Sequence, residues 1–462
     1  MSDSKSVNLT HALSAATDTL LKSKPRCPSQ PSRTAALGAG AAAIACLALP
    51  TLATAAEPGE WDIDTAVLFY SETDRVSAVE PVISATRNFA NDKKLNLKLV
   101  YDALTGASPS GAVPSSQVQT YTRPSGQGSY TTAAGEIPLD DTFRDSRIAV
   151  SGGWSQPALG GTGSIGFNVS SEYDYVSLGL NTGYAYDFAK NNATVSIGLG
   201  YAADTIEPEG GVPLEGSCLF GASASSGCSE TSFDATRRDT SEDKNTLDLL
   251  LGYTQVLGKN TVAQVNFTLS QSDGYHTDPF KLVSVVDTDN SEGNGIGEPE
   301  RHIHELRPDS RSKSGVFFRV KHMFFGRDVL DASYRFQSDD WGMASNTIDL
   351  RYRWVIGNNK AITPHLRYYD QSAVDFYTPF LRDTDPLPAE YTADYRQGSF
   401  TGLTIGAEYE TTVWNGKAIR VALEYYDQTG DSPSNAPGQL ANQDIFPDLQ
   451  AVMGRINFDF DW

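Results

Sequence analysis

Charged side chains recur at every second position along several segments in the C-terminal half of the sequence. The set comprises Arg319, Lys321, Asp331, Arg335, Asp349, Arg351, Arg353, His365, Arg367, Glu408, Arg420, Glu424, Arg455 and Asp459. Residues two apart in a strand share a face, so each segment would gather its charges on one side of a sheet. Two kinds of chemistry fit this pattern, and both stay open. An arginine-rich wall would favour anions in a pore, whereas paired charges of both signs would form a stiffening salt-bridge network.

Other residue groups suggest metal sites, but each departs from the pattern it imitates. Asp287, Asp289, Ser291 and Glu298 match ligand positions of a twelve-residue calcium loop, yet Glu292 stands where that loop requires glycine. His302 and His304 stand next to Glu305, and they are more simply explained as exposed loop histidines. We therefore expect no bound metal and no cofactor.

Catalytic constellations are also missing from the sequence. His276, His365 and Asp278 could serve a hydrolase at a membrane surface, but no G-x-S-x-G elbow or H-E-x-x-H motif accompanies them. Since an unassisted serine is a weak nucleophile, the expectation is that the protein is not an enzyme.

The elements that would position the charged wall are strands with one apolar face. In the C-terminal half, the apolar positions alternate with the charged ones, as in Val316, Phe318, Ile348, Leu350, Ile405 and Leu423. About sixteen such segments lie between residues 61 and 462, and short turns alternate with other connections, of which the longest are 106–141, 205–243 and 273–313. A charge facing lipid at mid-bilayer costs roughly 2–4 kcal/mol, so the charged faces must line the inside. The pattern predicts an all-β fold, a transmembrane antiparallel up-and-down β-barrel with short periplasmic turns and long extracellular loops.

The last thirteen residues give the clearest example of this alternation. Ile456, Phe458, Phe460 and the terminal Trp462 share one face, as in a final barrel strand whose aromatic end lies at the membrane interface. We expect this strand to engage the barrel-assembly machinery. Trp61, Trp154, Trp354 and Trp414 also fall at the predicted periplasmic rim, and Trp341 at the outer rim, which suggests an aromatic girdle in contact with outer-membrane lipid.

Residues 1–56 have the layout of an export signal. Basic residues precede an apolar run over 35–56, which ends in small residues. This pattern predicts a cleaved signal peptide with a long n-region, a barrel over 57–462, and residence in the bacterial outer membrane. A single transmembrane anchor is the alternative, and Pro50 together with the small-residue ending argues against it.

Charge and cysteine content fit an exported protein. The chain carries 36 Lys and Arg against 57 Asp and Glu, a net charge of −21, which argues against nucleic acid as a partner. Cys218 and Cys228 lie in one Gly/Ser-rich loop, and an even pair in an oxidising compartment predicts a disulfide that pins this loop.

Longer motifs span most of the chain after residue 100. They are YDALTGASPSGA (101–112), FRDSRIAV (143–150), SSEYDY (170–175), DGYHTDPFK (273–281), RPDSR (307–311), YRFQSDDWG (334–342) and PHLRYYDQSAVDFY (364–377). Together they resemble an uncharacterised family of bacterial outer-membrane proteins, domain-of-unknown-function family 3570 (DUF3570). The resemblance implies an outer-membrane barrel and supplies no catalytic residues. Most of these motifs lie where a strand meets an outer loop, and Asp278 and Asp375 each begin an acidic–aromatic group. Such groups would close the outer mouth, form a recognition surface, or serve folding alone.

Two functions remain in view. The first is a passive pore or transport protein for small solutes. The second is a closed structural or receptor barrel whose outer loops bind a partner.

Overall fold

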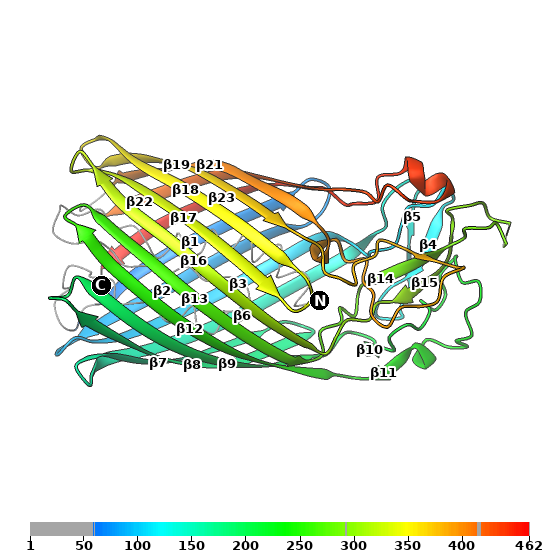
Figure 1. Ribbon diagram of the computed structural model, residues 1–462, viewed down its shortest axis with the longest axis horizontal. Helices are drawn as coiled ribbons and strands as arrows, with labels where there is room; N and C mark the ends of the chain where they lie inside the picture. Colours follow the sequence, from blue (N-terminus) through cyan, green and yellow to red (C-terminus); the bar gives the residue numbers. More distant parts are fainter. Residues whose placement is uncertain (1–58, 60, 292, 414–416, 462) are drawn as a thin grey trace.

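The computed structural model describes residues 59, 61–291, 293–413 and 417–461, with the backbone alone for 141–144, 460 and 461. Sixteen strands form the wall of a barrel. They are β1 (Trp61–Glu72), β2 (Ser77–Phe89), β3 (Lys93–Pro109), β6 (Leu139–Ala158), β7 (Gly161–Ser171), β8 (Tyr175–Phe188), β9 (Ala193–Ile206), β12 (Glu242–Gly258), β13 (Thr261–Gly274), β16 (Ser310–Phe324), β17 (Asp328–Asp339), β18 (Ala344–Gly357), β19 (Lys360–Gln371), β21 (Phe400–Thr412), β22 (Ala418–Gly430) and β23 (Leu449–Asp461). Neighbours in sequence are antiparallel neighbours in the wall, and β1 closes the ring against β23 (Figure 1). The predicted sixteen-stranded antiparallel barrel is confirmed.

The outer surface of the barrel is apolar because every second side chain points outward. Leu180 is 64% exposed, Ile405 53% and Leu423 62%. Their sequence neighbours are less exposed and face the interior, since strand side chains alternate between the two faces. This periodicity is the one that the sequence shows, and it produces the apolar band that a lipid bilayer requires.

The strands are joined at one end by short turns whose residues suit tight reversals. Asn91 and Asp92 connect β2 to β3 with φ angles of 61° and 55°, and Gly160 lies between β6 and β7 with a φ of 81°. Two-residue hairpin turns need this left-handed backbone, which asparagine, aspartate and glycine adopt most easily.

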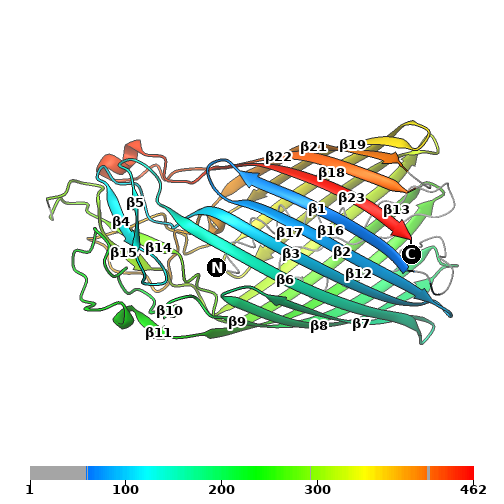
Figure 2. The same ribbon diagram turned by 180° about the vertical axis from the view of Figure 1, so that it is seen from behind.

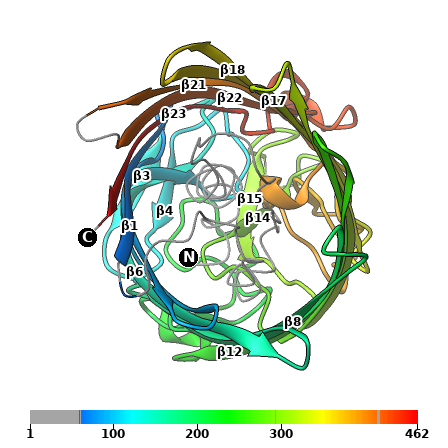
Figure 3. The same cartoon turned by 90° about the vertical axis from the view of Figure 1, so that its left-hand side faces the viewer.

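The other end of the barrel carries the long connections, which fold together. We call residues 110–138, 207–241, 275–309, 372–399 and 431–448 the loop cap. Within it lie the strands β4 (Gln119–Thr122), β5 (Ser129–Thr132), β10 (Val212–Pro213), β11 (Arg237–Asp239), β14 (Leu282–Val286), β15 (Pro299–His304) and β20 (Leu381–Arg382), and the 3₁₀ helices η1 (Asp234–Thr236), η2 (Tyr395–Gln397) and η4 (Gly438–Asn442). β4, β14 and β15 extend beyond the barrel (Figure 2) and fall inside the outline of the ring when seen along it (Figure 3). The cap therefore lies over the outer mouth.

The loop cap has its own packed core. β14 pairs with β15 on one side and with β20 on the other, and Val283, Val286 and Leu440 are fully buried there. Tyr121 is also fully buried and packs in a cluster with Leu282. Among the described residues, no helix is long and apolar enough to cross a membrane.

Candidate functional site

The predicted charged residues line the inside of the wall, where a network centred on His365 joins three strands. The His365 ring lies 3.0 Å from Asp349 Oδ2 through Nε2 and 2.8 Å from Glu424 Oε1 through Nδ1. Arg351 Nε lies 3.2 Å from the other Asp349 oxygen. β21 lies between His365 on β19 and Glu424 on β22, and it places Gly406 opposite both residues. A glycine is required there, because a Cβ atom would come within 2.6 Å of Glu424 Cγ.

Most of the other predicted residues also lie in ion pairs along this half of the wall. Arg319 and Lys321 share Asp331, Arg353 pairs with Glu410, Arg420 pairs with Asp459, and Arg455 pairs with Glu408. Arg335 lies 5.5 Å from the centre of the Phe317 ring, and Arg367 stands opposite Asp349 in the strand register. Paired charges cancel much of each other's electric field. The inward-facing arginines of β16–β23 therefore also form a network of ion pairs that links neighbouring strands.

The remaining wall carries fewer ion pairs, among them Lys244 of β12 with Asp204 of β9 at 3.4 Å, and it also contains uncharged pairs that were not predicted. In these pairs the cross-strand partners are an asparagine and a glycine: Asn168 opposite Gly179, Asn181 opposite Gly166 and Asn266 opposite Gly252. A Cβ atom on Gly179 would meet Asn168 Oδ1 at 2.1 Å, so that side chain lies over the bare glycine backbone. The signal in the sequence was the spacing of Gly166 and Asn168, and of Gly179 and Asn181, two apart on the inward face.

The tryptophans of the predicted girdle fall into three groups. Trp354 is 52% exposed near the short-turn end, and Trp61 and Trp154, near the same end, lie beside Arg87 and Phe89. Trp341 corrects the prediction, because it is at the outer end but only 5% exposed. Its indole nitrogen donates to Ser310 O at 2.7 Å and Arg311 covers its ring at 4.1 Å, so it belongs to the cap side rather than to the lipid face. Trp414 lies outside the described residues.

The last strand closes the ring as its pattern suggested. Ile456 stands between Val67 of β1 and Val421 of β22, and Phe458 is 37% exposed on the outer face. The Phe460 side chain and Trp462 lie outside the described part of the chain, as do residues 1–56 of the predicted signal peptide.

A cluster of buried charges holds the loop cap together. It contains three carboxylates and three cations, contributed by the connections 275–309 and 372–399: Asp278, Glu305, Asp394, Lys281, Arg307 and Arg396. Arg396 contacts Asp278 at 2.9 Å and Asp394 at 2.5 Å, and Arg307 contacts Glu305 at 2.6 Å and Asp394 at 2.8 Å. Burial alone would lower the pKa of Arg396, but the adjacent carboxylates raise it above its usual value. The cluster is neutral overall, as a buried charged group must be to be tolerated.

The two loop histidines are buried, which corrects the expectation that they are exposed. His302 and His304 on β15 are 1% and 4% exposed. Ser284 Oγ lies 2.9 Å from His302 Nδ1. Burial lowers the pKa of His302 to about 4, and burial together with Arg237 lowers that of His304 to about 3. Both rings are therefore neutral parts of the cap core at neutral pH.

The segment that resembles a calcium-binding loop does not bring the side chains of Asp287 and Glu298 together as ligands of one ion. Asp287 accepts from the backbone of Asp289 at 3.1 Å. Glu298 instead accepts from Ser115 Oγ at 2.6 Å, in a different connection. Glu292 lies outside the described residues.

His276 makes a serine–histidine contact at the outer rim. Its Nε2 atom lies 2.7 Å from Ser272 Oγ and its Nδ1 atom 2.8 Å from Gly274 O. Ser272 is 8% exposed and also donates to Arg311 O at 3.3 Å. Neither residue lines either of the two cavities described for the cap, so this contact joins a strand end to the cap.

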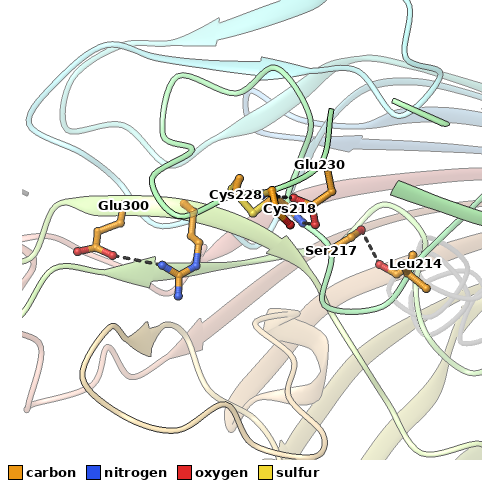
Figure 4. Close-up of a disulfide and its surroundings, with 8 residues drawn as sticks. Leu214, Ser217, Cys218, Cys228, Glu230 and Glu300 are labelled. Atoms are coloured by element: carbon orange, nitrogen blue, oxygen red, sulfur yellow. Dashed lines mark hydrogen bonds and ion pairs between the residues drawn. A yellow bond between two sulfur atoms is a disulfide. The ribbon is translucent and has the colours of Figure 1, made fainter. Parts of the chain in front are cut away.

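The predicted cysteine pair forms a disulfide in the cap. Cys218 and Cys228 are joined by a disulfide, and Cys218 N donates to Glu230 Oε1 at 3.3 Å (Figure 4). The backbone of Cys218 also forms an isolated antiparallel β-bridge with Ile303 of β15. Beside the disulfide is an open cavity of about 1000 Å³, bordered by parts of four cap connections and lined mainly by residues 375–390.

One family comparison covers almost the whole chain. The family described as "Protein of unknown function (DUF3570)" matches residues 35–460. The chain belongs to this family. None of the curated proteins compared with this DUF3570 chain matches it.

Solved structures similar to the DUF3570 chain are barrels with very different sequences. CdiB from Acinetobacter baumannii shows a TM-score of 0.44 and 8% identity over 88% of this chain and 61% of that one. A bacterial polysaccharide outer membrane secretin gives 0.40 and 7% over 88% and 100%. The outer membrane protein opdK from Pseudomonas aeruginosa gives 0.38 and 10% over 87% and 99%. The DUF3570 chain thus spans less than two thirds of CdiB.

Two parts of the DUF3570 barrel combine polar and charged side chains. The inner wall carries paired charges along β16–β23 and asparagine–glycine pairs between β7 and β8 and between β12 and β13. The cap adds a cavity that the sequence did not reveal, because its walls come from connections far apart along the chain.

Proposed function

We propose that this protein is a selective channel for small solutes in the outer membrane. The solutes would enter the channel through the loop cap. One observation carries the proposal. A closed sixteen-stranded barrel is covered at its outer mouth by a cap with its own core, disulfide and cavity. Barrels of this strand number are wide enough to hold an aqueous channel. A packed cap over such a channel would select solutes by binding, in addition to size.

The inner wall supports a transport role with weak charge selectivity. Basic residues of β16–β23 face the interior, but most of them lie within ion-pair distance of a carboxylate. Each pair leaves only a dipole on the wall. We therefore propose that the lumen itself discriminates only weakly by charge, because the local surplus of arginine over carboxylates is small.

A closed receptor barrel is the second candidate, and the cap favours it. The cap contains a core of buried apolar residues and a neutral cluster of six charges. Loops that only surround the mouth of a pore do not need such a packed interior. In this alternative the cap binds a ligand and nothing passes the barrel.

Single-channel conductance of the refolded protein in a planar bilayer, under a salt gradient, tests the channel. We expect discrete conductance in the wild type. Arg351→Ala, which removes one cation from the Asp349–His365 network, should shift selectivity towards cations, while Arg238→Ala on the exposed cap surface should leave it unchanged. A barrel that migrates as folded on unheated gels but stays silent, also after reduction of the disulfide, would reject the channel in favour of the receptor.

The proposal includes the expected route and surroundings of the protein. The chain would be exported by a cleaved signal peptide, assembled by recognition of its last strand, and surrounded by outer-membrane lipid. We propose no catalytic step and no nucleic-acid partner.

A further inference from the structure

We propose that the cavity of the loop cap binds a small organic cation, that is, a protonated amine with an apolar or aromatic body. This inference deepens the proposed function and rests on it, since the cavity would then be the entry site of the channel.

The charges that line the cavity are unequal. The lining of the cavity contains two arginines and four acidic residues, Glu230, Asp375, Asp385 and Glu390. The Glu230 carboxylate accepts from the backbone nitrogens of Cys218 and Ser229. Asp375, Asp385 and Glu390 are exposed, and none of them forms an ion pair with another described residue. The lining thus has an excess of negative charge, in a chain whose net charge is −21. A concave site of one sign attracts ligands of the opposite sign.

Both arginines of the lining are engaged by the cap. Arg382 Nη2 donates to Asn435 O at 2.7 Å, and Arg301 Nη1 lies 3.4 Å from Glu300 Oε2. These contacts leave both guanidinium charges in place, so the lining holds four carboxylates against two cations. Among the described residues, Asp375, Asp385 and Glu390 form no ion pair and are exposed, so a cationic ligand can reach them.

Aromatic and aliphatic side chains supply part of the remaining cavity surface. Phe376 and Tyr377 directly follow Asp375, and Phe380 and Leu387 lie further along the same connection. The Phe376 ring is held by an edge contact with Trp341, their centres 5.1 Å apart. Aromatic faces attract ammonium groups and cover apolar bodies. The combination of fixed rings with unpaired carboxylates suits an amine that carries an apolar group.

The size and position of the cavity also fit a small molecule. A volume of about 1000 Å³ lies at the upper end of the range for ligand sites, about 300–1000 Å³. One wall is fixed by the Cys218–Cys228 disulfide and by Ile303 of β15, and the opposite wall is the proline-rich segment 385–390. The disulfide-pinned wall gives the site a preformed side.

Calorimetric titration of the refolded full chain in detergent micelles tests the site with three probes. These are phenethylamine as a cation, phenylacetate as an anion and maltose as a neutral polyol. We expect phenethylamine to bind at least tenfold more tightly than either of the others, and to bind more weakly in 500 mM than in 20 mM NaCl. Stronger binding of phenylacetate or maltose, or no binding of phenethylamine, would overturn the proposal.

A matched pair of triple variants locates the binding. Asp375→Asn, Asp385→Asn and Glu390→Gln together should weaken phenethylamine binding at least tenfold. Glu136→Gln, Glu209→Gln and Asp234→Asn neutralise the same number of exposed cap carboxylates away from the cavity and should leave binding unchanged. Equal effects of the two triples would refute a local site. Binding by a protein that is silent in bilayers would keep the site and reject the channel, while conductance without binding would do the reverse.

Discussion

Arg396→Ala should open the loop cap without unfolding the barrel. The Arg396 side chain is 4% exposed, and its partners Asp278 and Asp394 are 2% and 0% exposed. Its removal leaves three buried carboxylates facing only Lys281 and Arg307. Breaking a buried ion pair on one side costs about 3–5 kcal/mol, because the remaining charge stays desolvated and uncompensated.

Hydrogen exchange at the amides of β14 and β15 measures this cost. A loss of about 3–4 kcal/mol in local opening energy should speed their exchange by about 100- to 1000-fold. The barrel strands pair only with one another in the wall, so the variant should keep the gel mobility of a folded barrel before heating. Arg238→Ala is the control, since its side chain is 33% exposed and an exposed pair contributes about 0–1 kcal/mol.

The double variant Arg396→Ala, Asp394→Ala tests whether the six charges act as one network. It restores equal numbers of buried carboxylates and cations, so its cost should be smaller than the sum of the two single costs. Wild-type exchange rates in Arg396→Ala, or simple additivity in the double variant, would refute the reasoning.

Three further perturbations follow from single contacts. His302 in the unfolded cap takes up a proton near pH 6.5 but in the folded cap only near pH 4, so its contribution to the stability of the cap should fall as pH drops through this window, by at most about 3 kcal/mol. His302→Gln should make that fall shallower and leave the contribution of His304, as read from the exchange of β15 corrected for intrinsic rates. Cys218→Ser with Cys228→Ser opens a loop closed over a separation of ten residues, which should cost the cap about 3 kcal/mol and speed thermolysin cleavage within 207–241. Gly406→Ala places a Cβ atom 2.5 Å from Leu423 O and should lower the temperature of heat modification through about 1–3 kcal/mol of overpacking. Gly357→Ala, where a Cβ atom meets open space, is its control.

The barrel could be predicted from the sequence because the pattern that specifies each strand lies within that strand. Each strand alternates between lipid and interior, so the period of two appears within ten residues. The segment beginning at Lys360 shows this, since His365 and Arg367 alternate with Leu366 and Tyr368. Turn residues such as Asn91 and Asp92 then mark the strand ends.

The cap could not be predicted because its order comes from distant partners. β14 is buried along its whole length, so it shows no alternation to recognise. Asp278 and Arg396 form an ion pair across 118 positions, and nothing in the local spacing indicates it. His302 and His304 looked like surface residues for the same reason, since the segments that bury them lie elsewhere in the chain.

The two acidic–aromatic motifs show how burial separates residues that look alike in the sequence. Asp278, before Pro279 and Phe280, is 5% exposed and bonded to Arg396. Asp375, before Phe376 and Tyr377, is exposed and lines the cap cavity. The first motif therefore closes the cap, and the second remains available to a ligand. The charges of the inner wall are largely paired with one another, whereas Asp375 lies outside any ion pair among the described residues. In the channel that we propose, the cap cavity would therefore discriminate by charge more strongly than the lumen does.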